Sequence, residues 1–178
     1  MHSLLIHACS QENRLLRWLN QGLRHDALRM LMVFSSRLGD GVLWFTLCCL
    51  LLCWQGIAMW PALLSGALSI GLCLALFMAL KKRISRPRPF EVMIGLRTAV
   101  APIDLWSFPS GHAINAFCVA MWVQLFFPVL APGVWGMAAL IAISRVALGL
   151  HYPSDVLSGA LLGAMIASAS HYLLWMIF

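Results

Sequence analysis

Residues 41–80 read GVLWFTLCCLLLCWQGIAMWPALLSGALSIGLCLALFMAL and contain no charged side chain. A helix needs roughly 20 apolar residues to cross a hydrocarbon core about 30 Å thick, so this stretch is long enough to cross a membrane twice. The turn falls between Gln55–Gly56 and Trp60–Pro61, because Gly and Pro interrupt helices and Pro is tolerated at a first helical position. The stretch therefore predicts two membrane helices, one from Gly41 to about Trp54 and one from Pro61 to Leu80.

Two further charge-free stretches, 113–144 and 156–178, extend this pattern along the chain. They predict helices from Ser110 to Pro128, from the Pro132–Gly133 turn to Leu150, and from Pro153 to the C-terminus. Only 10% of the residues are charged, against about 25% in a typical soluble domain. The predicted fold class is an all-α, integral-membrane helical bundle with about five transmembrane helices.

The N-terminal part differs from the rest because it is amphipathic. Between Glu12 and Arg24, leucines recur on one helical face and arginines on the other, which is typical of a helix that lies in the headgroup layer. A second short helix is predicted from Ala27 to Arg37, with Asp26 as its cap and Gly39 at its end. The chain is therefore interpreted as one domain over 1–178, in which 1–39 form interfacial helices and 40–178 form the transmembrane core.

The charge and the cysteines exclude two other classes of protein. The net charge is +6, but the basic residues lie among membrane segments, so no nucleic-acid partner is expected. The six cysteines lie mostly in apolar runs, and their spacing matches neither a zinc site nor a disulfide framework. The expected partners are the phospholipid bilayer and a membrane-lipid substrate, and the sequence gives no indication of an oligomeric state.

Counting the crossings places the remaining polar residues on one side of the membrane. The second predicted crossing ends, and the third begins, on the side that also holds the end of the fourth and the start of the fifth. The polar stretches 81–112 and 145–155 fall on that side. The sequence therefore predicts that its polar chemistry gathers at one membrane face.

Three short motifs lie in those polar stretches, and each also has a simpler interpretation. The basic run 81–89, KKRISRPRP, is common after a membrane helix, where it contacts anionic headgroups. The run 108–112, FPSGH, is compatible with an ordinary helix start, although free amides there also form an anion site. In the third, 144–155, Arg145 follows an apolar helix and either snorkels to the interface or faces a polar partner. Their joint occurrence on one face favours a shared site.

Taken together, the motifs resemble the three-part signature of the type-2 phosphatidic acid phosphatases, also called lipid phosphate phosphatases. The matching positions are Lys-x6-Arg-Pro (Lys81, Arg88, Pro89), Pro-Ser-Gly-His (109–112) and Ser-Arg-x5-His-x3-Asp (Ser144, Arg145, His151, Asp155). The resemblance covers 81–155 closely, and the predicted helices extend it to most of the chain. It implies a small bacterial membrane enzyme that hydrolyses a lipid phosphate.

The resemblance also implies a role for each signature residue. His151 is expected to attack phosphorus and form a phosphohistidine, while Asp155 orients its ring and His112 acts as general acid and then base. Phosphoryl transfer needs positive charge and hydrogen-bond donors around the equatorial oxygens. The residues expected to bind the phosphate are Lys81, Arg88, Ser110, Gly111 and Arg145. No metal and no other cofactor is expected, because the arginines supply the positive charge.

The substrate and the reaction class leave alternatives open. The candidate substrates are a polyprenyl diphosphate such as undecaprenyl diphosphate, or a glycerolipid phosphate such as phosphatidylglycerophosphate or phosphatidate. Undecaprenyl diphosphate phosphatases commonly carry Asp where this chain has Gly111. A lipid phosphotransferase that uses the same intermediate is one alternative function, and a non-enzymatic lipid-binding or transport protein is another.

Two rules give opposite answers for the orientation in the membrane. The resemblance implies a multi-pass protein of the bacterial cytoplasmic (inner) membrane with its site facing the periplasm or exterior. Positively charged residues, however, normally gather on the cytoplasmic side, and here they lie on the site side. We expect the orientation that the family implies, because Lys81, Arg88 and Arg145 have a catalytic explanation.

Overall fold

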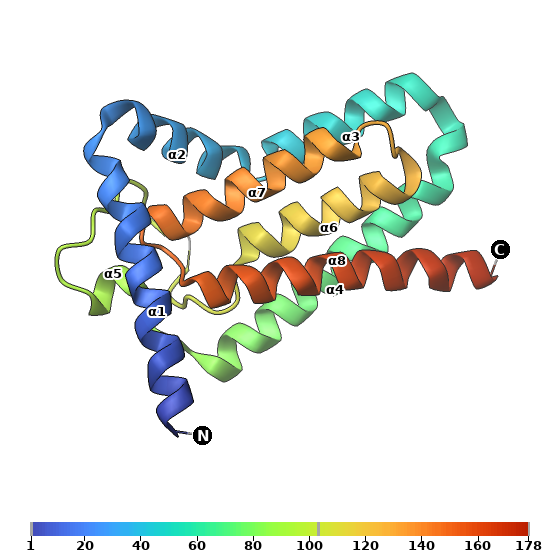
Figure 1. The fold of residues 1–178 in the computed structure, drawn as a ribbon. Helices are drawn as coiled ribbons and strands as arrows, with labels where there is room; N and C mark the ends of the chain where they lie inside the picture. The colour runs from blue at the N-terminus through green and yellow to red at the C-terminus, as the bar shows by residue number, and fades with distance from the viewer. Residues whose placement is uncertain (1, 103, 178) are drawn as a thin grey trace.

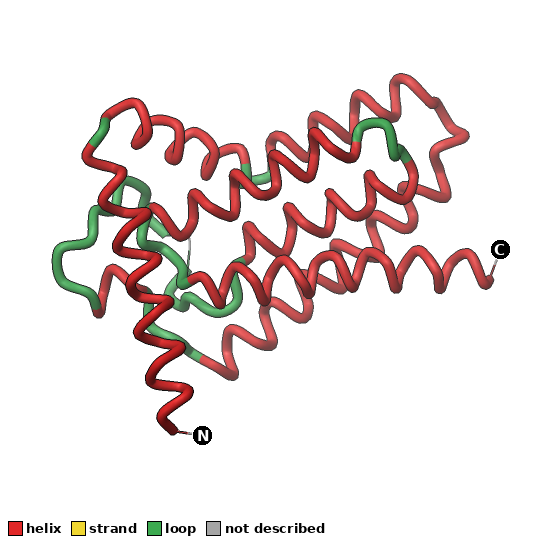
Figure 2. Tube along the Cα trace, in the orientation of Figure 1, coloured by secondary structure: helices red, strands yellow, loops and turns green. Residues whose placement is uncertain are grey.

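The computed structural model describes residues 2–102 and 104–177, and these contain helices but no strands. Figure 2 shows helices joined by short loops, apart from one longer loop between α5 and α6. The predicted all-α fold class is confirmed. The elements in chain order are α1 (His2–Gln21), η1 (Gly22–Arg24), α2 (Asp26–Leu38), α3 (Val42–Gln55), η2 (Gly56–Met59), α4 (Trp60–Ile84), α5 (Pro89–Val92), α6 (Gly111–Phe126), α7 (Ala131–Ala147) and α8 (Pro153–Ile177).

The long helices form an elongated bundle, and α6 lies in its middle in contact with α4, α7 and α8 (Figure 1). The helix α1 crosses one end of the bundle, where α7 ends and α8 begins, and the C-terminus lies at the opposite end. The loop between α5 and α6 lies at the same end as α1. Most of the polar residues named above are therefore gathered at this end.

Small residues allow α6 and α8 to approach closely. A Cβ atom at Gly163 would lie 2.2 Å from the carbonyl oxygen of Ile114, and one at Gly159 would lie 2.7 Å from that of Ser110. Because these contacts are to backbone, no side-chain adjustment would make room. Gly159 and Gly163 form a G-x-x-x-G pair, which is typical of membrane helices that pack backbone to backbone.

The five segments predicted to cross the membrane are all helical. Two stretches of the described chain, Val42–Val92 and Pro153–Met176, are long and apolar enough to cross on their own. The helices α6 and α7 are equally apolar but have 16 and 17 residues, or about 24–26 Å at 1.5 Å per residue. The helix α6 is shorter than predicted, because it ends at Phe126 instead of Pro128. The helix α7 is shifted toward the N-terminus: it begins at Ala131, with Pro132 in its first turn instead of in a preceding turn, and it ends at Ala147, before Gly149, which adopts a φ of 70°.

The N-terminal helices differ from the prediction in two ways. The first begins at His2 rather than Glu12. The second includes Asp26 in its first turn, where the carboxylate pairs with Arg29 at 2.9 Å instead of capping the helix. This helix, α2, packs on α7 and buries Met32, Ser35 and Ser36, so it forms part of the bundle. That residues 1–39 lie in the headgroup layer stays a prediction.

Candidate active site

A cavity of about 210 Å³ opens at the end of the bundle where α6 begins and α7 ends. His112, on the first turn of α6, and His151, in the loop between α7 and α8, both line it. Its other charged or titratable lining residues are Asp40, Arg88, Asp104 and Arg145. The two histidines that the sequence analysis singled out therefore line one cavity. The helices α4, α6 and α7 and the loops between helices contribute to its lining.

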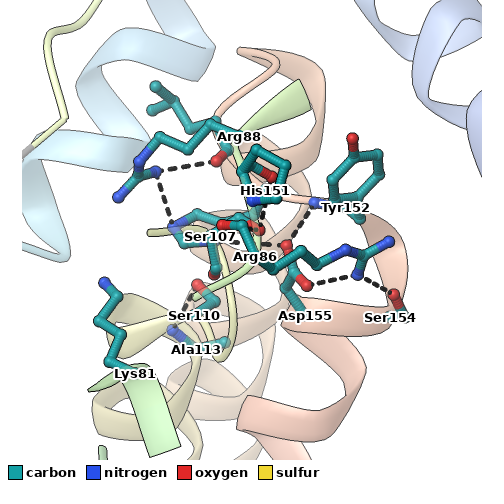
Figure 3. A network of polar contacts seen from close by, with 12 residues as sticks. Lys81, Arg86, Arg88, Ser107, Ser110, Ala113, His151, Tyr152, Ser154 and Asp155 are labelled. Carbon is teal, nitrogen blue, oxygen red and sulfur yellow. Dashed lines mark hydrogen bonds and ion pairs between the residues drawn. The ribbon is translucent and has the colours of Figure 1, made fainter. Parts of the chain in front are cut away.

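His151 is held by its backbone surroundings in one orientation (Figure 3). It is 2% exposed, and its Nδ1 lies 2.6 Å from the carbonyl oxygen of Ser107. A carbonyl oxygen only accepts, so Nδ1 carries the proton and Nε2 keeps its lone pair. Burial, with Arg145 and Arg88 nearby, lowers the pKa of His151 to about 4 despite the opposing effect of Asp155. The ring is therefore neutral at pH 7, with an unprotonated nitrogen 3.4 Å from Arg88 Nη1.

Asp155 holds the loop that carries His151 more than the ring itself. Its Oδ2 accepts a hydrogen bond from the Tyr152 amide at 2.8 Å, and its Oδ1 accepts one from Arg86 at 2.6 Å. The distance from Oδ2 to His151 Nδ1 is 3.8 Å, which is too long for a hydrogen bond. The expected partner of the ring is thus replaced by the Ser107 carbonyl, and Asp155 acts on the imidazole through its charge.

Arg86 is separated in function from its neighbour Arg88. Its guanidinium bonds to Asp155, to the Ser154 hydroxyl at 2.8 Å and to Glu12 on α1 at 2.6 Å, and it stacks 3.8 Å over the Tyr152 ring. Burial opposes the charge of Arg86, but Asp155 and Glu12 raise its pKa. This arginine therefore ties α1 to the start of α8 and is not available to a substrate.

Arg88 and Lys81 share one carboxylate, which belongs to Asp104. Arg88 Nη2 lies 2.6 Å from Asp104 Oδ1, and Lys81 Nζ pairs with the other carboxylate oxygen. Arg88 also donates to the carbonyl oxygens of Asp104, at 3.1 Å, and Leu150, at 2.8 Å. Burial works against the charge of Asp104, but Lys81 and Arg88 lower its pKa. The Asp104 carboxylate thus pairs with two of the three cations that the sequence analysis assigned to a phosphate.

Arg145 enters the cavity from the end of α7 and is only 3% exposed. Its Nη1 donates to the Ser36 hydroxyl of α2 at 2.5 Å. Its Nε is buried and has no hydrogen-bond partner within the described part of the chain. A buried charged donor without a partner is costly, so this group indicates a place for an anion.

The start of α6 supplies free backbone amides. Ser110 is fully buried and caps the helix, since its hydroxyl accepts from the Ala113 amide at 3.5 Å. Gly111 lines the cavity, and a Cβ atom there would lie 2.9 Å from the Phe77 ring of α4. A side chain at this position would therefore have to displace the Phe77 ring, and the amides at this helix end favour an anion.

Not every predicted residue reaches the cavity. Among the described residues, Lys81, Ser110 and Asp155 are absent from its lining, and each acts through a neighbour: Asp104, the α6 helix end and the His151 loop. Sequence reasoning also missed several contributors. These are Glu12, Ser36, Asp40, Arg86, Asp104 and Ser107. One signal for Asp40 and Asp104 was available, because the chain has only 6 acidic residues and these two lie on the predicted site side, Asp40 directly before the first predicted crossing and Asp104 in the loop before the third.

Within residues 2–102 and 104–177, no three His, Cys, Asp or Glu side chains lie close enough together to hold a metal ion. The metal-free chemistry stays a prediction.

A second, larger hollow lies beside the cavity. Its volume is about 590 Å³, and its lining is almost entirely apolar side chains of α3, α4 and α6, including Trp44, Ile70 and Trp122. Asn115 lines both the hollow and the cavity. This hollow, called the apolar groove below, therefore adjoins the polar site at Asn115.

Comparisons with known proteins show which family and which folds this chain is similar to. The family model described as "PAP2 superfamily" matches residues 58–178. An undecaprenyl-diphosphatase of Sulfolobus acidocaldarius is 30% identical over 152 residues, which cover 80% of this chain and 69% of that protein. The crystal structure of Aquifex aeolicus LpxE superposes with a TM-score of 0.73 at 28% identity and covers 88% of this chain and 92% of that one. The transmembrane PAP2-type phosphatidylglycerolphosphate phosphatase of Bacillus subtilis gives 0.74 at 26% identity, with 97% and 88% covered.

Proposed function

Because this chain belongs to the PAP2 superfamily and is a membrane lipid phosphatase, we propose that it removes a phosphate or diphosphate headgroup through a phosphohistidine on His151. The observation that carries this proposal is the shared cavity: His112, His151, Arg88 and Arg145 all line it. Two imidazoles and a set of fixed cations are the groups that a metal-free transfer of a phosphoryl group requires.

In the proposed mechanism the phosphate first replaces the Asp104 carboxylate. Arg88, with Lys81 behind it, binds equatorial oxygens in place of that carboxylate, and the planar guanidinium suits two oxygens at once. Arg145 Nε and the Gly111 amide supply further donors. These groups neutralise the charge that spreads over the oxygens during transfer.

The chemical steps then follow from the tautomer of His151. Its Nε2 lone pair attacks phosphorus, the P–N bond forms, and the bond from phosphorus to the leaving oxygen breaks. His112 gives that oxygen a proton. Water next attacks the phosphohistidine while His112 takes a proton from it, the P–N bond breaks, and inorganic phosphate leaves. Asp155 and the Ser107 carbonyl hold His151 in place throughout.

The apolar groove supports a lipid rather than a soluble phosphate ester as substrate. It shares Asn115 with the cavity, and two of the helices that line it, α3 and α4, lie in a stretch long and apolar enough to cross a membrane. A hydrocarbon chain bound there would leave its phosphate among the arginines. A polyprenyl diphosphate and a glycerolipid phosphate both have this form. Their linking groups, which would lie near Asn115, differ.

We place the enzyme in the bacterial cytoplasmic membrane, with several crossings and with the cavity at the periplasmic or outer face. The family resemblance supports this orientation, whereas the count of basic residues favours the other one.

The function is tested with purified protein in detergent and a panel of lipid phosphates and diphosphates, scored by release of inorganic phosphate. We expect one substrate class to be hydrolysed in the presence of EDTA. His151→Ala should lose turnover and trap no acid-labile phosphoenzyme while remaining folded. Turnover that survives in His151→Ala would exclude it as the nucleophile, and transfer of label to a second lipid instead of water would make the protein a phosphotransferase.

A further inference from the structure

The turn between α2 and α3 contacts His112, although it lies outside the three signature motifs. Asp40, in this turn, has its Oδ1 2.8 Å from His112 Nε2. The match to the family covers 58–178, so Asp40 precedes it. The signature gives the roles of the two histidines but assigns no partner to His112.

The glycines on either side of Asp40 fit the turn to the ring. A Cβ atom at Gly39 would lie 2.7 Å from His112 Cδ2 and 2.9 Å from Ile141 Cγ2. Gly41 adopts a φ of 114°, which residues with a side chain rarely adopt. The Gly39–Asp40–Gly41 turn is therefore built to bring a carboxylate against the imidazole.

The charges around His112 indicate what the Asp40 carboxylate does. Arg88 and Arg145 line the same cavity as His112, and a protonated imidazole near two arginines is unfavourable. Asp40 supplies a negative charge in contact with the ring and is itself 3.5 Å from Arg37. Asp104, the other acidic residue of the lining, is already paired with Lys81 and Arg88.

We propose that Asp40 is a positioning residue for His112. It fixes the ring through Nε2 and stabilises the imidazolium, which leaves Nδ1 to carry the proton that the leaving oxygen receives. This inference rests on the acid–base role of His112 in the proposed function. Asp40 transfers no proton itself: the proton passes from His112 to the leaving oxygen in the first step and from water to His112 in the second.

The test uses leaving groups that differ in their need for a proton. An alkyl phosphate such as octyl phosphate releases a poor leaving group and depends on the general acid, whereas p-nitrophenyl phosphate releases a stable anion. Asp40→Asn should lower kcat/KM for octyl phosphate, which covers the steps up to departure of the leaving group, by about 10-fold or more, since general acid catalysis is worth roughly 10²–10⁴-fold. Its kcat/KM for p-nitrophenyl phosphate should change far less, because that leaving group needs no proton and the later hydrolysis of the phosphohistidine does not enter kcat/KM.

Three further variants separate the possible outcomes. Asp26→Asn removes an exposed acid from α2 and should leave both substrates unaffected. Asp40→Glu should recover part of the octyl phosphate activity. His112→Ala gives the full loss expected when the acid is removed.

Equal loss of kcat/KM for both substrates in Asp40→Asn would indicate a structural role and overturn the inference. Unchanged or increased kcat/KM for octyl phosphate would also overturn it. If His112→Ala itself keeps full octyl phosphate turnover, the acid role in the proposed function is wrong, which is a different result from failure of Asp40 alone.

Discussion

At the scale of single residues, the site is set by which groups surround each ionisable side chain. His151 donates from Nδ1 to a backbone carbonyl, and this bond determines that Nε2 is the unprotonated nitrogen. Its neutral state follows from burial together with two arginines. A neutral imidazole with a fixed tautomer is ready to attack without losing a proton first.

The lowered pKa of His151 leads to a prediction about pH. Because its pKa lies at about 4, below the ordinary value of about 6.5, the ring should protonate, and lose its nucleophilic lone pair, only as the pH falls through about 4. The ¹⁵N-histidine NMR signal that disappears in His151→Ala should therefore titrate near this value. Titration of that signal near 6.5 would contradict the description of the site.

Asp104 leads to a second prediction at this scale. Its carboxylate occupies Lys81 and Arg88, so a phosphate must compete with it. Asp104→Asn keeps the shape but removes the charge, and inhibition by inorganic phosphate should become stronger by about 10-fold, which corresponds to roughly 1.4 kcal/mol. The measurement is the inhibition constant against wild type and Asp26→Asn. Weaker inhibition would mean that Asp104 orients Arg88 rather than competing with the substrate.

At the scale of elements, α6 and α8 decide where the site is. They pack backbone to backbone at Gly159 and Gly163, and their first turns carry His112 and Asp155. The Ser110 amide also donates to the Asp155 carbonyl at 3.1 Å. The packing of two helices thus fixes the distance between the start of α6 and the loop that holds His151.

This close packing predicts the effect of one added methyl group. Gly163→Ala would place a Cβ atom 2.2 Å from the Ile114 carbonyl oxygen, so the helices must separate, and overpacking of this kind costs about 1–3 kcal/mol. We expect a lower Tm in detergent and lower turnover. Gly136→Ala on α7 is the control, because a Cβ atom there meets nothing within 4 Å. Equal Tm values for the two variants would show that α6 and α8 do not need this contact.

Sequence reasoning located these elements better than it located their contacts. The charge-free stretches gave all five long apolar helices, since burial in lipid requires long apolar runs. The contact of α2 with α7 could not be predicted, because an amphipathic helix fits either a headgroup layer or another helix. The Ser107 carbonyl was missed for a similar reason. Every residue has a backbone oxygen, so the sequence does not indicate which donor a particular one will bond to.

At the scale of the whole molecule, the polar cavity and the apolar groove adjoin each other at Asn115, which lines both. The signature residues predicted the polar part, since their residue types and spacing are specific to phosphate chemistry. The groove could not be read from the sequence, because its lining residues resemble any lipid-facing helix surface. It is a property of how α3, α4 and α6 are arranged.

The groove predicts that substrates should be distinguished by their hydrocarbon chains. Ala67→Phe would fill part of the groove, so KM for long-chain lipid phosphates should rise while turnover of p-nitrophenyl phosphate changes little. Ala139→Phe is the matched control, because Ala139 is exposed on α7 and does not line the groove. A similar rise in KM for both variants would mean that the chain binds elsewhere.

Several residues that precede the signature motifs in the chain contact the site. Glu12 on α1 bonds to Arg86 and to the Ser154 amide at 3.0 Å, and so it holds the segment that leads into the start of α8. Ser36 and Asp40, which precede α3, likewise contact Arg145 and His112. We therefore expect the smallest active unit to be larger than residues 58–178, which the family model matches. A chain shortened to begin at residue 58 would keep every signature residue and still lose three of the side chains that hold them in place.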